Sequence, residues 1–369
     1  MCAAHAKGKT LIIERNKRFG NKVLASGGGC CNFSNLNISS ENYLSQNPHF
    51  VKSALSEFGV SDFLELLEKY NIKWEEREFG QLFAFSSHEI LDMLIKEASK
   101  PNVDFLCNRE VSDIVKDEEL FAVSAGSEKY YAKNIIVASG GISFSSLGVS
   151  EKCFDIAKKF GLEIVPLKPA LCGLNYKQNL HDEFKELSGI SLKVKISQGK
   201  KYFIDQLLFT HKGLSGPSAL QMSLYFNENF PANVNFLPDT DVVSFIESFK
   251  NTNETPSKIF QKLLPKKLLQ TLLSSCDFQL ANANKQQIQE IISKLTAYEL
   301  YCNLASFEKA EAMSGGVSTQ NISSKNMESK KIQGLFFAGE VLDVTGQLGG
   351  YNLHWAWASG YACASKGNL

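Results

Sequence analysis

The sequence predicts an α/β fold in which one domain is split by a long insertion. Three short apolar segments, 10–13, 133–138 and 335–338, are typical of buried strands, and the last two lead directly into glycines. Between these ends the pattern changes to alternating stretches followed by helical spacing. A Rossmann-like, nucleotide-binding domain formed by both ends of the chain is the expected architecture.

The expected domain boundaries follow from where the pattern changes. We expect residues 1–165 and 325–369 to form the discontinuous domain, with its first strand and glycine loop absent from this sequence. Residues 166–324 form the inserted domain, which we expect to be strand-rich over 166–230 and helical over 231–310.

In the N-terminal part, residues 10–13 predict the first strand. Apolar residues recur at helical spacing over 51–70, and residues 91–98 predict an amphipathic helix. Residues 103–123 alternate like paired strands, and 133–138 predict another buried strand.

In the C-terminal part, a helix is expected from Gly148 to about Phe160. Residues 192–210 alternate like a hairpin, whereas 239–300 are expected to be mostly helical. After the strand 335–338, a glycine-rich loop opens the final helix near Tyr351.

The charge balance narrows the class of partner. The 369 residues include 39 Lys and Arg and 39 Asp and Glu, so the net charge is zero. This argues against nucleic acid as a partner, because phosphate-binding proteins usually carry a basic excess; only the segment 15–22 offers a local basic contact. No apolar run approaches the roughly 18 residues that span a membrane. A small molecule is therefore the expected substrate.

The cysteines and histidines suggest no metal or disulfide site. The nine cysteines are scattered without a C-x-x-C pair, as expected of free thiols in a reducing cytoplasm. The six histidines show no metal-binding spacing, so no metal is expected.

Glu14 directly follows the first predicted strand. In dinucleotide-binding domains, an acidic residue at this strand end accepts hydrogen bonds from a ribose, although a solvated surface charge is the simpler interpretation. The glycine fingerprint should precede it by about 20 residues, which falls before Met1. The sequence is therefore expected to be a shortened form or to begin upstream.

A run of three glycines forms the second candidate site. Without a Cβ, such a run can approach a flat ligand or a phosphate, although a flexible surface loop is the alternative. The candidate ligand-binding residues of this segment are Ser26, Gly27, Gly28, Gly29 and Asn32. Cys31 is a weak candidate for a nucleophile because no nearby residue is identified as its base.

The third candidate site follows the last predicted strand, at Gly339 and Glu340. The carboxylate there can accept from a sugar or ribityl hydroxyl. The loop then brings Gly350 to the start of a helix, where unpaired N–H groups favour a developing anion.

Three segments together resemble a known family. ASGGGCCNFSN, LLFTHKGLSGP and GLFFAGEVLDVTGQLGGYNLHWAWASG closely resemble the BaiN-like (aminoacetone-oxidase-type) family of NAD(P)/FAD-dependent flavoproteins, and the likeness covers essentially the whole chain. The resemblance implies an FAD-binding domain of the glutathione-reductase type, interrupted by an inserted domain.

The resemblance also implies roles for individual residues. Glu14 would bind the adenosine ribose, and the backbone of Val111 would meet the adenine. The remaining implied FAD contacts are Gly140 and Gly141 beside the adenosine, Glu340 at the ribityl chain, Gly350, Tyr351, Asn352 and Leu353 at the isoalloxazine, and Ser26 to Asn32 against the flavin. Replacing Gly350 with Val is expected to abolish flavin retention while the protein stays folded.

Two departures from the family pattern concern the phosphates and the substrate. The G-G-G-x-A-G loop of relatives is missing, and Cys30 stands where many relatives carry Arg. In the turn 210–217, His211 or Ser215 could face the substrate. The alternative is a turn in which Ser215 caps a helix that begins at Pro217.

The function implied is an FAD-dependent oxidoreductase. It would transfer hydride or electrons between a reduced nicotinamide or small organic substrate and a second acceptor. NAD(P)H would bind only transiently, because no second fingerprint is present. The family likeness admits amine or ketone oxidation and reduction of conjugated enones. The alternative is a non-catalytic, truncated remnant or assembly module that binds FAD weakly or not at all.

Overall fold

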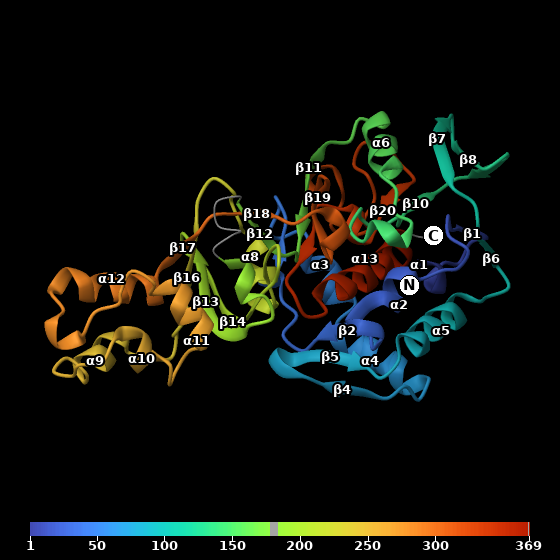
Figure 1. Cartoon of the computed structure of the whole chain (residues 1–369). Helices are drawn as coiled ribbons and strands as arrows, with labels where there is room; N and C mark the ends of the chain where they lie inside the picture. The colour runs from blue at the N-terminus through green and yellow to red at the C-terminus, as the bar shows by residue number, and fades with distance from the viewer. Residues whose placement is uncertain (178–183, 368) are drawn as a thin grey trace. The chain divides into compact units, whose positions relative to one another are not determined.

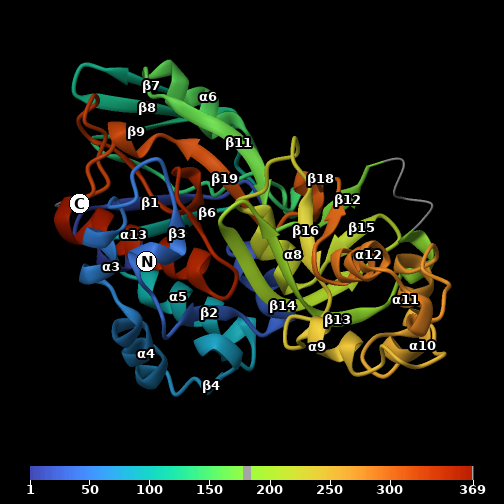
Figure 2. The ribbon, with the colours of Figure 1, turned by 90° about the vertical axis from the view of Figure 1, so that its left-hand side faces the viewer.

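The computed structural model describes residues 1–177, 184–367 and 369, which divide into two compact units. The first unit comprises 1–168 and 311–369, and the second comprises 169–310. The insertion therefore ends earlier than the expected residue 324. The reason is that β19 (Ala312–Val317) pairs with β11 (Ile164–Ala170), which returns the chain to the first unit (Figure 2).

Two parallel strand pairs form the Rossmann-like part of the first unit (Figure 1). β1 (Thr10–Ile13) pairs with β6 (Val103–Leu106), and β10 (Ile135–Val137) pairs with β20 (Leu335–Phe337). The strand predicted at 10–13 is confirmed, but it is only partly buried, with Leu11 39% exposed. The parallel direction of both pairs is typical of α/β domains.

The first unit contains further sheets and helices. β2 (Asn32–Asn35), β5 (Gln81–Ala84) and β4 (Trp74–Glu76) form one antiparallel sheet, in that order. The other strands are β7 (Val111–Asp117), β8 (Leu120–Ala125) and β9 (Glu128–Ala132), with the short pair β3 (Tyr43–Leu44) and β21 (Thr345–Gly346). The helices are α1 (Cys2–His5), α2 (Asn21–Ala25), α3 (Lys52–Glu57), α4 (Val60–Lys69), α5 (Ser87–Ala98), α6 (Lys152–Lys159) and α13 (Tyr351–Gly367).

The helical spacing predicted over 51–70 is divided into α3 and α4 at Gly59. The backbone of Gly59 is extended, and its N–H donates to Asp62 Oδ2 over 2.7 Å. This hydrogen bond satisfies the backbone amide at the start of α4. The chain therefore ends α3 before Gly59 and begins α4 after it.

The second unit contains a seven-stranded antiparallel sheet in the order β17-β16-β13-β14-β15-β12-β18. Its strands are β12 (Leu174–Tyr176), β13 (Ser191–Gln198), β14 (Lys201–Phe209), β15 (Gly213–Ser215), β16 (Ala232–Asn235), β17 (Tyr298–Leu300) and β18 (Cys302–Leu304). Its helices are α8 (Pro217–Ser223), α9 (Val242–Glu247), α10 (Pro256–Phe260), α11 (Lys266–Leu272) and α12 (Lys285–Thr296). The hairpin predicted at 192–210 is confirmed as β13–β14. The segment 231–310 is not purely helical, because β16, β17 and β18 lie in it.

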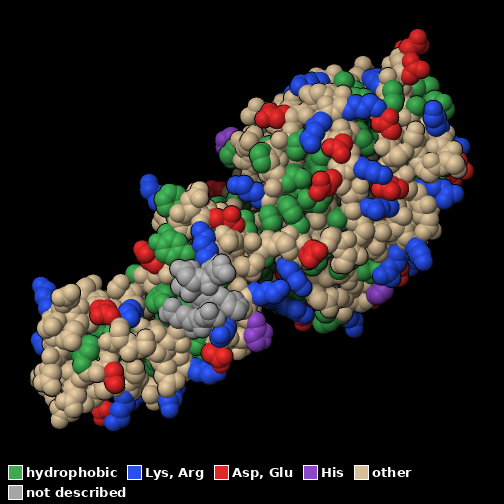
Figure 3. All heavy atoms as spheres, turned by 45° about the horizontal axis from the view of Figure 1, so that its top comes forward, with side chains coloured by type: hydrophobic (Ala, Val, Ile, Leu, Met, Phe, Trp, Pro, Cys, Tyr) green, Lys and Arg blue, Asp and Glu red, His purple; other side chains and the backbone are tan. Residues whose placement is uncertain are grey.

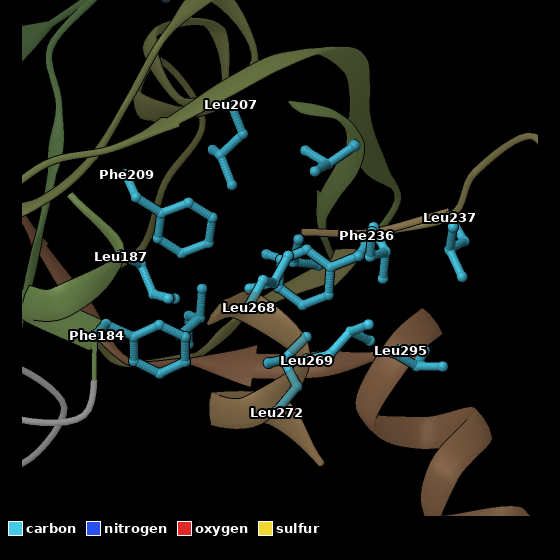
Figure 4. Packing of buried hydrophobic residues seen from close by; sticks show 14 of the residues in the cluster. Phe184, Leu187, Leu207, Phe209, Phe236, Leu237, Leu268, Leu269, Leu272 and Leu295 are labelled. Carbon is cyan, nitrogen blue, oxygen red and sulfur yellow. The ribbon is translucent and has the colours of Figure 1, made fainter. Parts of the chain in front are cut away.

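Aromatic and leucine side chains form the core of the second unit (Figure 4). Phe184 stacks on Phe209 with ring centroids 6.1 Å apart, and Leu207, Leu268 and Leu269 are fully buried. The sheet and the helices α8 to α12 contribute to one continuous core, so neither layer is expected to fold without the other.

The turn at 210–217 differs from the predicted helix cap. Ser215 lies in β15, and Gly216 occupies the N-cap position before Pro217. A Cβ on Gly213 would lie 2.0 Å from the carbonyl oxygen of Leu174. The glycines here therefore permit close strand packing, which explains the turn without a ligand.

Within the described residues, none of the helices has the length and apolar character needed to cross a membrane. All nine cysteines are free thiols.

His354 lies in the core of the first unit, on α13. Its ring is fully buried and its Nδ1 lies 2.9 Å from Ser34 Oγ, which is also buried. Burial lowers the pKa of His354 to about 4. Its lack of exposure fits a role in packing rather than in catalysis.

This burial predicts a pH-dependent stability. Unfolded His354 would titrate near 6.5, so the unfolded chain binds the extra proton, and stability falls as the pH drops from about 6.5 to 4. The contribution of this residue is up to about 3 kcal/mol. Urea unfolding of His354→Gln should show a shallower loss over this range. The exposed control His88→Gln should keep the wild-type slope; an unchanged slope in His354→Gln would contradict the assignment.

Candidate functional site

The carboxylate of Glu340 is the centre of the candidate site. It follows β20 at the start of a short 3-10 turn, and its side chain is only 12% exposed. Oε1 accepts from Ser143 Oγ at 3.2 Å and from the backbone N of Met313 at 2.9 Å. Oε2 accepts from Lys22 Nζ and, at 3.4 Å, from the backbone N of Gly141. Four donors from three separate parts of the chain thus converge on one carboxylate.

Lys22 belongs to the candidate site but was not predicted from the sequence. It lies on α2, and its ammonium group also donates to Ser143 Oγ over 2.9 Å. The sequence offers the segment 15–22 as a local basic contact for nucleic acid, but this lysine pairs with Glu340. Arg15 is occupied too, because it donates to the carbonyl of Val149 and pairs with Glu110. The only signal for Lys22 is its place in that basic segment, since its partner is 318 residues away in the sequence.

The two glycines after β10 have different surroundings. A Cβ on Gly141 would lie 2.9 Å from Cδ of Glu340, so this glycine permits the close approach of the carboxylate. Gly140 has φ +74°, and a Cβ there would meet no heavy atom within 4 Å. Gly140 therefore leaves open space next to the glycine that contacts Glu340, as a ligand cradle requires.

The triple glycine forms a short 3-10 turn, Ser26–Gly29, that begins where α2 ends. Gly27 packs under the ring of Phe83, because a Cβ would lie 2.9 Å from that ring. Gly28 and Gly29, with φ of +66° and +93°, are open, because a Cβ at either would meet no heavy atom within 4 Å. α2 carries Lys22, the partner of Glu340, and leads directly into this open turn.

The loop that opens α13 is bonded to β2. With its amide oriented to satisfy its neighbours, Asn32 accepts from the N–H of Gly350 at 3.2 Å. A Cβ on Gly350 would lie 2.2 Å from the carbonyl oxygen of Ser34. Gly350→Val should therefore disrupt the loop itself, which corrects the expectation that it would affect only the flavin.

The residues that follow use part of their backbone in bonds to the protein. The carbonyl of Tyr351 accepts from Tyr43 Oη at 3.0 Å, and the side chain of Asn352 bonds both backbone groups of Gly346. Leu353 lies in the first turn of α13, and first-turn N–H groups have no acceptor within their own helix. The amides of 351–353 are therefore the groups that this helix offers to a ligand.

Gly339 is fixed from both sides by α13. Its N–H donates to Ser359 Oγ at 2.9 Å, and its carbonyl accepts from Trp355 Nε1 at 3.1 Å. These bonds hold the end of β20, and with it Glu340, against the helix.

Glu14 and Val111 lie near the other strand pair. Glu14 follows β1, and its Oε1 accepts from the backbone N of Asn16 at 2.8 Å, which closes a local turn. Val111 begins β7 and pairs with Ala125. Neither residue is hydrogen-bonded to Glu340 or to its donors. A bound adenosine that met Glu14 and Val111 would therefore have to reach from them to Gly140.

Cys30 and Cys31 differ in exposure. Cys31 is fully buried, and burial raises its pKa to about 11, so its thiol is neutral and a poor nucleophile. Cys30 is partly exposed, and the guanidinium of Arg77 lies beside it. Arg77 stacks 3.9 Å from the centroid of Phe83. Arg77 therefore supplies a cation next to Cys30, the position at which many relatives carry an arginine of their own.

His211 and Ser215 belong to the second unit. His211 is exposed in the turn before β15, and Ser215 is half-buried in that strand. Their role at a substrate stays a prediction.

These features fit a flat, phosphate-containing cofactor. Three glycines in left-handed backbone conformations, Gly28, Gly29 and Gly140, leave space that any side chain would fill. The hydrogen-bonded carboxylate of Glu340 and the start of the 17-residue helix α13 lie in the same unit. The parallel strands and these loops are the features of a Rossmann-type, FAD-binding oxidoreductase.

Comparison with known proteins identifies the family. Residues 1–366 match the family model described as HI0933-like protein Rossmann domain. The chain belongs to this HI0933-like, FAD-binding Rossmann family, which includes the BaiN-like flavoproteins.

The chain is also similar to curated proteins and to a solved structure. The ribosomal RNA dihydrouridine synthase of Escherichia coli is 40% identical over 370 residues, which cover 98% of this chain and 92% of the relative. The 3-dehydro-bile acid delta(4,6)-reductase of Clostridium scindens is 27% identical over 387 residues, covering 98% and 93%. A quinol-fumarate reductase structure shares the fold, with a TM-score of 0.50 and 13% identity over all of this chain and 68% of its own.

The open glycines lead to a matched test of FAD binding. Gly140→Ala should weaken FAD binding at least about tenfold, because the methyl group would occupy the open space in the glycine loop that the cofactor is expected to fill. Gly161→Ala is the control, since Gly161 has φ +72° and equally open surroundings but lies outside the glycine loops. Both variants carry the same backbone strain and should lose similar stability.

Flavin fluorescence titration and thermal unfolding measure the two effects. Equal FAD affinity in Gly140→Ala and Gly161→Ala would show that Gly140 does not line the cofactor site.

Proposed function

We propose that this chain is an FAD-dependent reductase that converts uridine in RNA to dihydrouridine. Two curated relatives that share 40% and 41% identity over 98% of the chain are named ribosomal RNA dihydrouridine synthase. The observation in this chain that supports a redox role is the group of open glycines around the Glu340 carboxylate.

The reaction fits the chemistry that the relatives' names have in common. Dihydrouridine forms when hydride adds to C6 and a proton to C5 of a uracil, whose double bond is conjugated with the C4 carbonyl. The name of the bile acid relative likewise denotes reduction of double bonds in a 3-keto compound. Reduction of a carbon–carbon double bond conjugated with a carbonyl therefore accounts for both names.

The chain's own residues would bind and orient the reactants. Bound FAD would supply the hydride. The open glycines Gly28, Gly29 and Gly140 would leave room for the cofactor. The Glu340 carboxylate would accept a hydrogen bond from a hydroxyl group of the cofactor, which would replace a protein donor such as Ser143. The first amides of α13 would stabilise negative charge on the reduced cofactor. NAD(P)H is the proposed donor of the electrons.

An RNA substrate needs cationic contacts despite the zero net charge. On the face shown in Figure 3, Lys and Arg side chains are interspersed with Asp and Glu rather than gathered into one patch. The β13–β14 hairpin nevertheless offers one cationic group beside an aromatic ring. Lys195 Nζ lies 4.5 Å from the centroid of the Tyr202 ring, and Tyr202 is 56% exposed. Lysine beside an exposed aromatic ring is typical of single-stranded nucleic-acid contacts.

The test is direct formation of dihydrouridine. The FAD-loaded protein is incubated with NADPH and an unmodified ribosomal RNA transcript, and the digested nucleosides are analysed by mass spectrometry. Dihydrouridine should form only when both FAD and the reductant are present. Gly140→Ala should form less, in proportion to its lost flavin, and Gly161→Ala should match the wild type.

A flavin that NADPH reduces without formation of dihydrouridine would contradict the RNA substrate. A small conjugated enone is the second candidate substrate, supported by the bile acid relative. Reoxidation of the flavin by such an enone, but not by RNA, would favour it.

A further inference from the structure

Phe79 occupies an unusual position at the tip of the β4–β5 turn. Its φ is +59° and its ψ is +26°, in the left-handed region that favours glycine. The residue is also 65% exposed. A bulky residue in this conformation is a strained outlier, and such strain often marks a functional site.

The surrounding structure holds this strained turn in place. The carbonyl of Phe79 accepts from Nδ2 of Asn35 and from Nδ2 of Asn37, each at 3.2 Å. The backbone N of Arg77 donates to the carbonyl of Gln81 at 2.8 Å. These bonds fix the backbone so that the ring stays in solvent.

The same turn is bound to the candidate site. Asn35 is buried, and its Nδ2 also donates to the carbonyl of Gly349 at 3.0 Å. A Cβ on Gly349 would lie 3.2 Å from Cγ of Gln81. One asparagine side chain therefore connects the Phe79 turn to the loop that opens α13.

A second contact links the β4–β5 hairpin to the triple glycine. Phe83 of β5 underlies Gly27, and Arg77 stacks on the same ring beside Cys30. The hairpin thus contacts both glycine loops, and it presents an exposed aromatic ring and a guanidinium next to them.

We infer that Phe79 stacks on the pyrimidine ring of the RNA substrate, and this inference rests on the proposed function. A single exposed apolar residue is ordinary on a protein surface. Phe79 differs because its backbone conformation would suit glycine better, so the ring is retained at a cost to folding. Stacking of unpaired bases on aromatic side chains is the common way in which proteins hold single-stranded RNA. Arg77 is paired with Glu75, whose Oε1 lies 2.6 Å from its Nε, and would exchange this carboxylate for the adjoining phosphate.

The backbone conformation supplies a sharp test. Phe79→Gly removes the ring and relieves the strain, so its thermal stability should equal or exceed that of the wild type. Its affinity for a fluorescein-labelled, uridine-rich RNA oligonucleotide should fall about tenfold or more in an anisotropy titration. Phe79→Tyr should retain the affinity. Phe85→Ala, which removes another exposed ring at 57% exposure, should bind like the wild type.

The outcomes separate this inference from the proposed function. Equal oligonucleotide affinity in Phe79→Gly and the wild type overturns the stacking role, as does a wild-type protein that does not bind the oligonucleotide. If the wild type forms no dihydrouridine but Phe79→Gly still loses affinity for the oligonucleotide, the proposed reaction fails and the stacking role stands. In a productive enzyme, Phe79→Gly should raise KM for RNA with a smaller change in kcat.

Discussion

The arrangement of the first unit depends on the burial of one carboxylate. A carboxylate removed from water must be compensated by donors, and Glu340 receives four of them, from Lys22, Gly141, Ser143 and Met313. These donors come from α2, from the loop after β10 and from β19, while Glu340 itself follows β20. Satisfying this one group therefore fixes four segments that are far apart in the sequence.

The glycines of the candidate site are of two kinds. Gly27, Gly141 and Gly350 lack a side chain because protein atoms lie where a Cβ would stand. Gly28 and Gly140 lack one although nothing of the protein occupies the space. Packing explains the first kind. The left-handed backbone explains the second kind, and its open surroundings leave room for a bound cofactor. Glu340 would then exchange a protein donor for a cofactor hydroxyl without losing its compensation.

Much of the fold could be predicted from local patterns. The strand at 10–13, the hairpin at 192–210 and the glycine-to-helix loop near Tyr351 all follow from periodicity and glycine placement. The α/β class and the FAD-binding family, inferred from the glycine segments, are confirmed. The predicted end of the insertion is too late in the chain, because the pairing of β19 with β11 joins segments distant in sequence.

The details of the site could not be predicted, because they depend on contacts between distant residues. Nothing local identifies Lys22 as the partner of Glu340, or Asn35 as the link between Phe79 and Gly349. Ser215 has the residue type of a helix cap, but pairing of β15 with β14 takes it into a strand. The zero net charge argues against nucleic acid, whereas two relatives are named for a reaction on ribosomal RNA. Net charge is a sum over the whole chain, so it does not reveal whether cationic and aromatic side chains lie together locally.

The most direct test of the central claim is the visible absorption spectrum of the protein after incubation with FAD and desalting. The claim is that the open glycines around Glu340 form a cofactor site. It predicts that a flavin spectrum persists in the protein fraction, altered from that of free FAD because the isoalloxazine leaves water. A folded protein that stays colourless after the same treatment would contradict it.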